Sequence, residues 1–156
     1  DLISMASSLH WVDFEKAIGE FQRILRPNGR FVALWNTRQI DTNPLLTEIE
    51  LILHQMVPDL KRVSTGGSEF CNSLSDRLAN SGIFEAPVYM EAIHTEHMSP
   101  ERYLGIWRSV NDVRVQAGEQ RFHTFLRSVQ QTLEGVDCIE AKYSTRAWCS
   151  RVIKSD

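Results

Sequence analysis

The first 36 residues constrain the fold most, because they place one amphipathic helix between two largely apolar segments. The apolar segments cover residues 2–6 and 30–35. The residues between them are apolar at intervals of three and four, which predicts a helix with one buried face. The residues of that face are Phe14, Ala17, Ile18, Phe21, Ile24 and Leu25. A strand, one helix and a second strand within so few residues indicate a right-handed crossover between parallel strands.

The ends of this helix are marked by residues that begin and end helices. Asp13 is a good N-cap, since its carboxylate can accept a hydrogen bond from a free backbone N–H one turn further on. Pro27-Asn28-Gly29 ends the helix and starts a turn into the second strand.

Three motifs in this segment carry a family resemblance: Asp1-Leu2-Ile3, Ser8-Leu9-His10-Trp11 and the run Arg23–Phe31. Together they resemble the class I S-adenosylmethionine-dependent methyltransferases, and most of all the small-molecule branch called the type 11 methyltransferase domain. In that family a His-Trp pair follows the fourth strand, and a Pro-Gly-Gly turn precedes the fifth. Asn28 replaces the first Gly of that turn, and Asn tolerates the left-handed conformation that such turns use.

The resemblance implies an α/β fold that is the C-terminal half of a Rossmann-like methyltransferase sheet. Residues 1–156 would be the C-terminal part of one methyltransferase domain, with strands four, five, seven and six. A helical, lid-like insertion would occupy about 99–134. The family's glycine-rich cofactor loop precedes every motif matched here, so we expect this chain to be a fragment without that loop.

The remaining elements are expected from periodicity and from helix-ending residues. Asn43-Pro44 and Ser99-Pro100 each predict a helix start with a cap followed by proline. Residues 59–73 are predicted to be an irregular loop, whose Gly66-Gly67 pair fits no phosphate-binding spacing. The predicted helices cover 44–57, 75–80, 100–111 and 119–134, with a linker at 111–118 and strands at about 86–98 and 139–152.

By resemblance, the residues that leave the fourth strand lie beside the methionyl part of S-adenosylmethionine. The matching residues are Met5, Ala6, Ser7 and Ser8. The alternative is a plain strand-to-helix connection whose hydroxyl groups satisfy nearby backbone groups. Given the family match, we favour cofactor contact in the intact protein.

No catalytic residue is identified with certainty from the sequence, and His10 is a weak candidate. Its ordinary pKa, close to neutral pH, would suit a general base. A packing role beside Trp11 is favoured, because methyl transfer to a good nucleophile can require only positioning.

Four residues are candidates for substrate binding: Trp11, Asn36, Tyr103 and Trp107. Asn36 begins a polar loop at the carboxyl end of a strand, where α/β proteins bind ligands. Tyr103 and Trp107 lie on one face of the predicted 100–111 helix and would belong to a substrate lid. An aromatic stripe at helical spacing is more often core, and the core interpretation is favoured.

The main functional hypothesis is an S-adenosylmethionine-dependent methyltransferase acting on an unidentified small molecule, with this fragment alone inactive. The alternative is a non-catalytic α/β interaction or accessory module that retains half of the fold. Upstream coding sequence with a glycine-rich loop would distinguish the two.

Composition and residue spacing limit the kinds of partner that this chain could bind. A net charge of −3 argues against nucleic-acid binding, which needs a basic surface. The sequence has no apolar run of the roughly 18 residues that cross a membrane. The three cysteines are expected to be reduced thiols of a cytoplasmic protein, since their spacing is not that of metal ligands. His94 and His97 would point to opposite faces of a strand, so no metal site is predicted.

The order of strands in the family, three-two-one-four-five-seven-six, leads to a prediction about assembly. Without strands three to one, the segment 2–6 would lie at a sheet edge although its apolar run is typical of a strand buried on both faces. An unprotected apolar edge recruits another chain. We therefore expect a homodimer, or an exchange of elements, through residues 1–8.

Overall fold

The computed structural model describes residues 1–61 and 69–154, which form two compact units. Unit 1 combines Asp1–Thr37, Ser64–Ile93 and Ser144–Asp156, and unit 2 combines Arg38–Val63 and His94–Tyr143. Each unit has its own cluster of buried apolar side chains.

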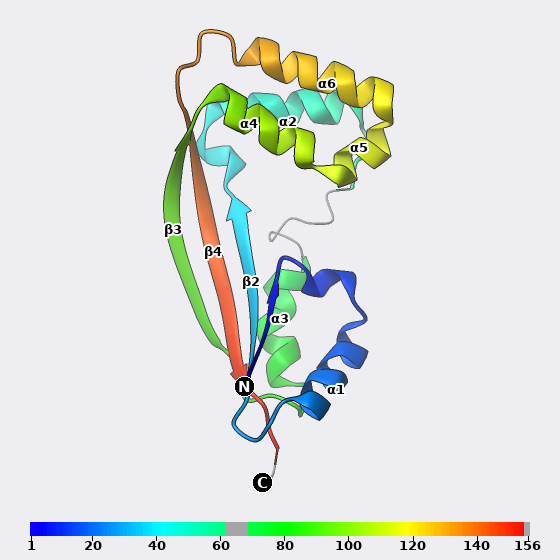
Figure 1. Cartoon of the computed structure of the whole chain (residues 1–156), viewed down its shortest axis with the longest axis vertical. Helices are drawn as coiled ribbons and strands as arrows, with labels where there is room; N and C mark the ends of the chain where they lie inside the picture. Colours follow the sequence, from blue (N-terminus) through cyan, green and yellow to red (C-terminus); the bar gives the residue numbers. More distant parts are fainter. Residues whose placement is uncertain (62–68, 155–156) are drawn as a thin grey trace. The chain divides into compact units, whose positions relative to one another are not determined.

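The described residues form a four-stranded sheet and six α-helices, with two short 3₁₀ turns, η1 and η2 (Figure 1). The strands are β1 (Leu2–Ala6), β2 (Arg30–Arg38), β3 (Val88–Met98) and β4 (Ile139–Arg151). The helices are α1 (Phe14–Ile24), α2 (Pro44–Met56), α3 (Glu69–Ala79), α4 (Pro100–Ser109), α5 (Asn111–Ala117) and α6 (Glu119–Thr132); η1 is Leu9–Trp11 and η2 is Ile40–Thr42.

The strand order in the sheet is β1-β2-β4-β3. β1 and β2 are parallel, with Ile3 opposite Phe31 and Met5 opposite Ala33. The crossover through α1 is therefore confirmed, and so is the predicted order of strands four, five, seven and six.

The turn between α1 and β2 has the backbone geometry that its sequence predicts. Asn28 has a φ of 65°, in the left-handed region that Asn tolerates better than most residues. At Gly29 an added Cβ would lie 2.9 Å from the carbonyl oxygen of Arg26, so the turn needs glycine. The side chain of Asp13 accepts a hydrogen bond from the N–H of Lys16 at 3.3 Å, which confirms it as the N-cap of α1.

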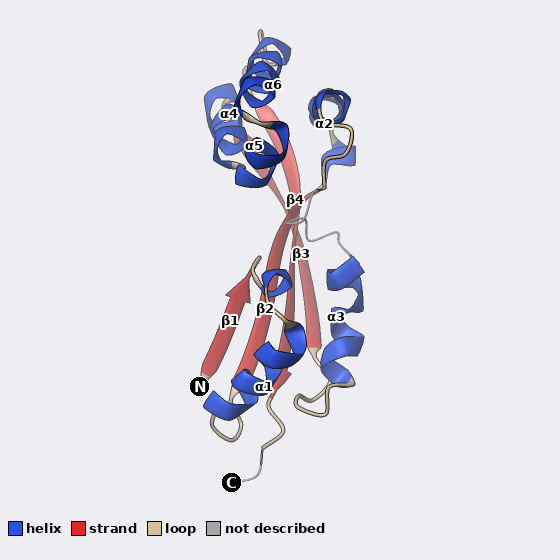
Figure 2. Cartoon of the chain, turned by 90° about the vertical axis from the view of Figure 1, so that its right-hand side faces the viewer, coloured by secondary structure: helices blue, strands red, loops and turns tan. Residues whose placement is uncertain are grey.

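In unit 1, α1 and α3 pack against one face of the strands. In Figure 2, α1 crosses in front of β2 and α3 lies beside β3. Phe31, Ala33 and Trp35 alternate along β2 and are all buried toward the helices. Trp148 of β4 packs edge-on against Trp35, with ring centroids 5.7 Å apart, and donates its indole N–H to Ser75 of α3 at 3.0 Å.

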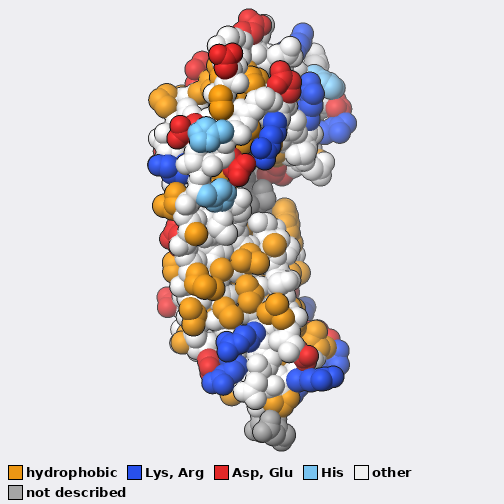
Figure 3. All heavy atoms as spheres, turned by 60° about the vertical axis from the view of Figure 1, so that its left-hand side comes forward, with side chains coloured by type: hydrophobic (Ala, Val, Ile, Leu, Met, Phe, Trp, Pro, Cys, Tyr) orange, Lys and Arg blue, Asp and Glu red, His pale blue; other side chains and the backbone are white. Residues whose placement is uncertain are grey.

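The opposite face of these strands carries apolar side chains that none of the described residues of unit 1 bury. Alternation along the strands and the cross-strand contacts place them on one face, since Leu2, Val32 and Leu34 share it on β1 and β2. Leu2, Val88 and Met90 are 63%, 61% and 51% exposed. Figure 3 shows hydrophobic side chains gathered over this part of the molecule. We call this surface the open face; it consists of Leu2, Ala6, Val32, Leu34, Val88, Met90, Ala147 and Cys149.

The sequence interpretation of β1 was wrong in one respect. Its apolar run predicted burial on both faces, but Ile3 and Met5 pack against the core while Leu2 and Ala6 are exposed. Hydrophobicity shows that a strand can be buried, but which of its faces is buried depends on the elements that pack there.

In unit 2, α2, α4, α5 and α6 pack around a core that contains Trp107 of α4, which is 0% exposed. The two cap-and-proline predictions are confirmed: Asn43 accepts from the N–H of Leu45 at 2.9 Å, and Ser99 accepts from the N–H of Arg102 at 3.3 Å. The predicted linker 111–118 was wrong, because residues 111–117 form α5 and bury Val113 and Ala117.

The start of α3 also differs from the prediction. α3 begins at Glu69, whereas the sequence predicted an irregular loop to residue 73 and a helix from residue 75. Cys71 and Leu74 are buried in the core of unit 1, which explains why the helix includes them. The Gly66-Gly67 pair lies outside the described residues.

β4 changes its buried parity along its length. Ile139 and Ala141 are buried, in odd positions, whereas Ser144, Trp148 and Ser150 are buried in even positions. β4 therefore has no single buried parity over its whole length, because it contributes to a different core in each unit.

A matched pair of isoleucines on α1 tests the packing of unit 1. Ile18 is 1% exposed and Ile24, which the sequence placed on the same buried face, is 49% exposed. We expect Ile18→Ala to lower the free energy of unfolding by about 2–5 kcal/mol. Ile24→Ala should change it by only about 0.5 kcal/mol. Native-state hydrogen exchange of β2 amides measures both; equal losses would contradict this packing.

The free edge of β1 gives a second prediction. The N–H of Ser7 donates to Leu34 at 2.8 Å, and successive N–H groups alternate in direction, so those of Ser4 and Ala6 point away from β2. We expect the purified chain to sediment as a dimer or larger species that pairs through this edge. Ser4→Pro should weaken the association, because it removes one edge donor and leaves the bonds to β2 in place.

Ala6→Lys should weaken the association as well, since charge protects sheet edges. Leu51→Lys is its control, because Leu51 is also exposed, at 57%, but lies on α2 in unit 2. A chain that stays monomeric, with the Ser4 and Ala6 amides exchanging freely, would refute edge pairing.

Candidate functional site

The candidate site lies at the carboxyl end of β1, where the chain turns sharply into η1. Ser7 has a φ of 46°, which is uncommon for a residue other than glycine, and its N–H is held by Leu34 of β2. Leu9 is 0% exposed and anchors the turn in the core. Strained backbone of this kind occurs often at ligand-binding positions, because the surrounding structure must support it.

Aromatic rings surround this turn. His10 lies with its ring centroid 4.8 Å from that of Trp11 and 6.2 Å from that of Trp35. Trp11 is 61% exposed, so one indole is presented to solvent beside the strand end while the other is buried. Of the residues predicted to contact the cofactor, Met5 to Ser8, Ser8 is joined to Trp11 by a backbone hydrogen bond of 3.1 Å.

Two buried nitrogen atoms at this place make no hydrogen bond within the part of the chain that the structure describes. They are Nε2 of His10 and Nε1 of Trp35. A buried polar atom without a partner is unfavourable, so groups like these often mark a position that a ligand or water fills. The hydroxyl of Ser8 also makes no capping hydrogen bond to η1.

The environment of His10 favours its neutral form. Burial lowers the pKa of His10 below its usual value of 6.5, because the imidazolium loses part of its hydration. A neutral imidazole whose Nε2 has no partner can accept a proton or a hydrogen bond at that atom.

Asn36 was expected to begin a loop after the strand, but β2 continues to Arg38 and Asn36 lies within it. Its side-chain oxygen accepts a hydrogen bond from the hydroxyl of Thr145 at 3.0 Å. It is exposed, and Thr145 comes from β4. Its side-chain amide nitrogen thus remains the group with which it could meet a ligand.

Tyr103 and Trp107 belong to unit 2, where they are 1% and 0% exposed. The guanidinium carbon of Arg38 lies 5.3 Å from the centre of the Tyr103 ring and 5.5 Å from that of Trp107. Burial raises the pKa of Tyr103, which keeps its phenol protonated. The structure thus places both aromatic residues in a core that also holds a cation, and their contact with a substrate stays a prediction.

The sequence interpretation did not identify Trp35 and Arg38 as functional candidates. Both lie on β2, where an apolar strand with a polar end gives no sign of a function. Their significance comes from their neighbours, the ring of His10 for one and two buried aromatic rings for the other.

Unit 1 also contains a polar cluster that the sequence did not indicate. The carboxylate of Glu91 accepts hydrogen bonds from Ser144 and, at 2.8 Å, from the phenol of Tyr89. The Ser144 contact is the larger cause that lowers the pKa of Glu91. This cluster joins the edge strand β3 to β4.

Among the described residues, no group of three His, Cys, Asp or Glu side chains could hold a metal ion.

Comparisons with known proteins agree with the fold. No protein-family profile matches the chain. An uncharacterized methyltransferase-like protein of Schizosaccharomyces pombe is 42% identical over 53 residues, which are 34% of this chain and 20% of the relative. An uncharacterized methyltransferase of Mycobacterium tuberculosis is 50% identical over 38 residues, 24% of this chain and 16% of the relative.

A solved structure from Anaeromyxobacter dehalogenans, provisionally assigned as a type II methyltransferase, matches 99% of this chain with a TM-score of 0.57 and 14% identity. The match covers 66% of that protein, so the chain spans less than two thirds of it, and the aligned stretches are a fifth or less of the curated relatives. The fold of this chain is therefore that of part of a Rossmann-like methyltransferase domain. No helix of the described residues combines the length and the apolar character needed to cross a membrane.

The burial of His10 predicts a pH dependence. As the pH falls through 6.5, the unfolded chain takes up a proton at this residue before the folded chain does. The folded state should therefore lose stability below pH 6.5, until the folded His10 is protonated too. NMR titration should give a pKa below 6.5, and His10→Gln should remove this part of the stability loss. A pKa at or above 6.5 would contradict the burial.

Proposed function

We propose that the intact protein is an S-adenosylmethionine-dependent methyltransferase acting on a small molecule, and that this chain supplies the C-terminal part of its domain. The observation that carries the proposal is the turn after β1, where strained Ser7 precedes His10 and an exposed Trp11 at a strand end of a methyltransferase fold. The curated relatives share sequence with part of the chain and are described as methyltransferases or methyltransferase-like.

The residues at the turn fit one wall of a site for S-adenosylmethionine. The exposed face of the Trp11 indole offers a surface for a flat or cationic group. The hydroxyl of Ser8, which does not cap η1, and the N–H of Trp35, which has no partner among the described residues, offer polar contacts. A second wall, with the glycine-rich loop that the family uses, has no counterpart in the sequence. The fit supports contact with the cofactor by residues 5–8 in the intact protein.

The bound cofactor would supply an activated methyl group for transfer to an oxygen, nitrogen or carbon nucleophile. The share of this chain would be positioning: Trp11, at the border of the cofactor site, and Asn36 of β2 would hold the acceptor. Nε2 of His10, neutral because burial lowers its pKa, could take the proton of an acceptor that must lose one. This role is secondary, since a good nucleophile needs no base.

The open face supports the view that the working domain is larger than this chain. A Rossmann-like sheet normally carries helices on both faces, because its strands are apolar on both. The apolar residues Leu2, Val88 and Met90 are more than half exposed on the face that the helices of unit 1 leave uncovered. In the proposed function the rest of the methyltransferase domain covers this face and pairs with β1.

The alternative is a non-catalytic accessory module with a methyltransferase-like fold. It is favoured by the lack of a glycine-rich cofactor loop in these 156 residues. The two functions differ in whether the full-length polypeptide binds the cofactor, which a binding measurement decides.

We predict that this chain alone binds S-adenosylmethionine weakly or not at all, whereas the full-length polypeptide binds it. Isothermal titration calorimetry measures both. A low micromolar dissociation constant for the chain alone corresponds to a binding free energy of about −8 kcal/mol. It would contradict the idea that a glycine-rich loop outside this sequence makes most of the cofactor contacts. A full-length protein that does not bind would favour the accessory module.

In the full-length protein, Trp11→Ala should weaken the binding of S-adenosylmethionine by up to about tenfold, because an exposed aromatic contact is lost. Val12→Ala is the matched control, since Val12 is the next residue along the chain and is 42% exposed. Equal effects of the two substitutions on cofactor affinity would show that Trp11 does not contact the cofactor.

A further inference from the structure

Unit 2 contains a groove between α4 and α6 whose lining includes none of the residues proposed above for cofactor or substrate binding. Two adjoining hollows make up the groove, with volumes of about 480 and 450 Å³. They share Leu104 and Arg108 of α4 and Gln130 of α6. The groove therefore follows the two helices for several turns, and Arg108 lies where its two halves meet.

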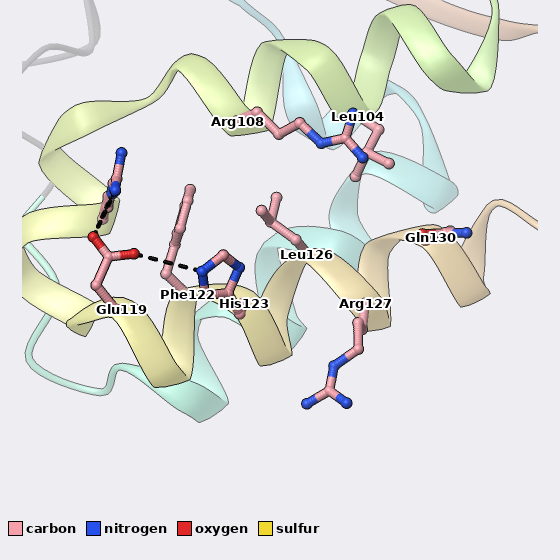
Figure 4. A pocket seen from close by; sticks show the side chains of 9 residues that line it. Leu104, Arg108, Glu119, Phe122, His123, Leu126, Arg127 and Gln130 are labelled. Atoms are coloured by element: carbon pink, nitrogen blue, oxygen red, sulfur yellow. Dashed lines mark hydrogen bonds and ion pairs between the residues drawn. The ribbon is translucent and has the colours of Figure 1, made fainter.

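The floor of the groove is apolar. Leu104 and Phe122 are 8% and 4% exposed, and Leu126 is half-buried between them and the surface. In Figure 4 Phe122 and Leu126 rise from α6 toward α4, while Leu104 comes from α4 itself. The second hollow continues the strip with Leu133 and Val136. An alkyl chain laid along Leu104, Phe122 and Leu126 in the first hollow would cover apolar side chains.

The charges around the first hollow are unequal. Glu119 is its acidic residue, and its carboxylate lies 2.7 Å from the guanidinium of Arg114 and 3.6 Å from Nε2 of His123. Arg108 forms no ion pair within residues 1–61 and 69–154. Its guanidinium extends over Leu104 in Figure 4, above the apolar floor. The groove thus offers a cation that no described carboxylate neutralises.

A planar guanidinium beside an apolar strip matches one kind of ligand well. Arginine binds a carboxylate through two parallel N–H···O bonds, and such charge-assisted bonds are stronger than neutral ones. The groove has two acidic residues besides Glu119. They are Glu101 and Glu134, and both line only the second hollow. A ligand with an anionic head at Arg108 and an apolar chain is favoured over one with a cationic head.

We propose that the α4–α6 groove binds an anionic amphiphile, a carboxylate that carries an alkyl or acyl chain. The carboxylate pairs with Arg108, and the chain lies in the first hollow along Leu104, Phe122 and Leu126. The site lies wholly in unit 2, and it does not depend on the proposed methyltransferase activity.

The experiment is an NMR titration of the ¹⁵N-labelled chain with octanoate below its micelle concentration. We expect saturable shifts of amides in α4 and α6. Octylammonium, with the same chain and the opposite charge, should not bind at these amides. Acetate, which has the head group alone, should bind more weakly than octanoate by at least about tenfold, because it covers none of the apolar strip.

A matched pair of arginines tests the head-group contact. Arg108→Gln should weaken octanoate binding by about tenfold or more, the effect of losing a charged hydrogen-bond partner. Arg127→Gln removes the same charge from the same hollow, but Figure 4 shows the Arg127 side chain directed away from Leu104 and Arg108. It should change affinity by less than about twofold, as for a screened surface charge.

Three results would overturn the proposal. Equal weakening by the two arginine substitutions would mean that octanoate senses only the overall charge. Equal binding of octylammonium would mean that the groove selects for apolar surface alone. Shifts confined to β2, β3 and β4 in unit 1 would place the ligand on the open face instead. Because both arginines are exposed, a ¹⁵N spectrum of each variant verifies that it is folded.

Discussion

The parallel pairing of β1 with β2 is the constraint on which unit 1 depends. Two parallel strands cannot be joined by a tight turn, so the chain must cross over, and α1 is that crossover. Parallel strands also end at the same edge of the sheet. The turn that begins at Ser7 therefore lies beside Leu34 and Trp35 of β2, and the contact of His10 with Trp35 follows from it.

The local features of the fold could be predicted because they depend on short-range chemistry. Asp13, Asn43 and Ser99 cap helices as their sequence contexts indicate, and Asn28 adopts the left-handed conformation that its turn needs. Features that depend on what packs against an element were predicted less well. Val110 provides no side-chain cap for α5, yet the helix forms because it buries Val113 and Ala117.

The same difference applies to the candidate site. The position of residues 5–11 at a strand end followed from the order of elements, since a loop after a parallel strand lies at the ligand-binding edge. The importance of Trp35 could not be predicted, because it comes from a buried indole N–H whose surroundings include no partner among the described residues. Arg38 is similar: a sequence records its charge, but only the packed helices bring Tyr103 and Trp107 to it.

The change of buried parity in β4 has a consequence for how the chain can vary. Ala141 is buried in one unit and Ser144 and Trp148 in the other, so the two cores use residues of opposite parity along one strand. Deleting one residue near Tyr143 would invert every side chain on one side of the deletion and leave the other side unchanged. Single-residue insertions and deletions should therefore be excluded from the middle of β4 during evolution, although both neighbouring segments could accept many substitutions.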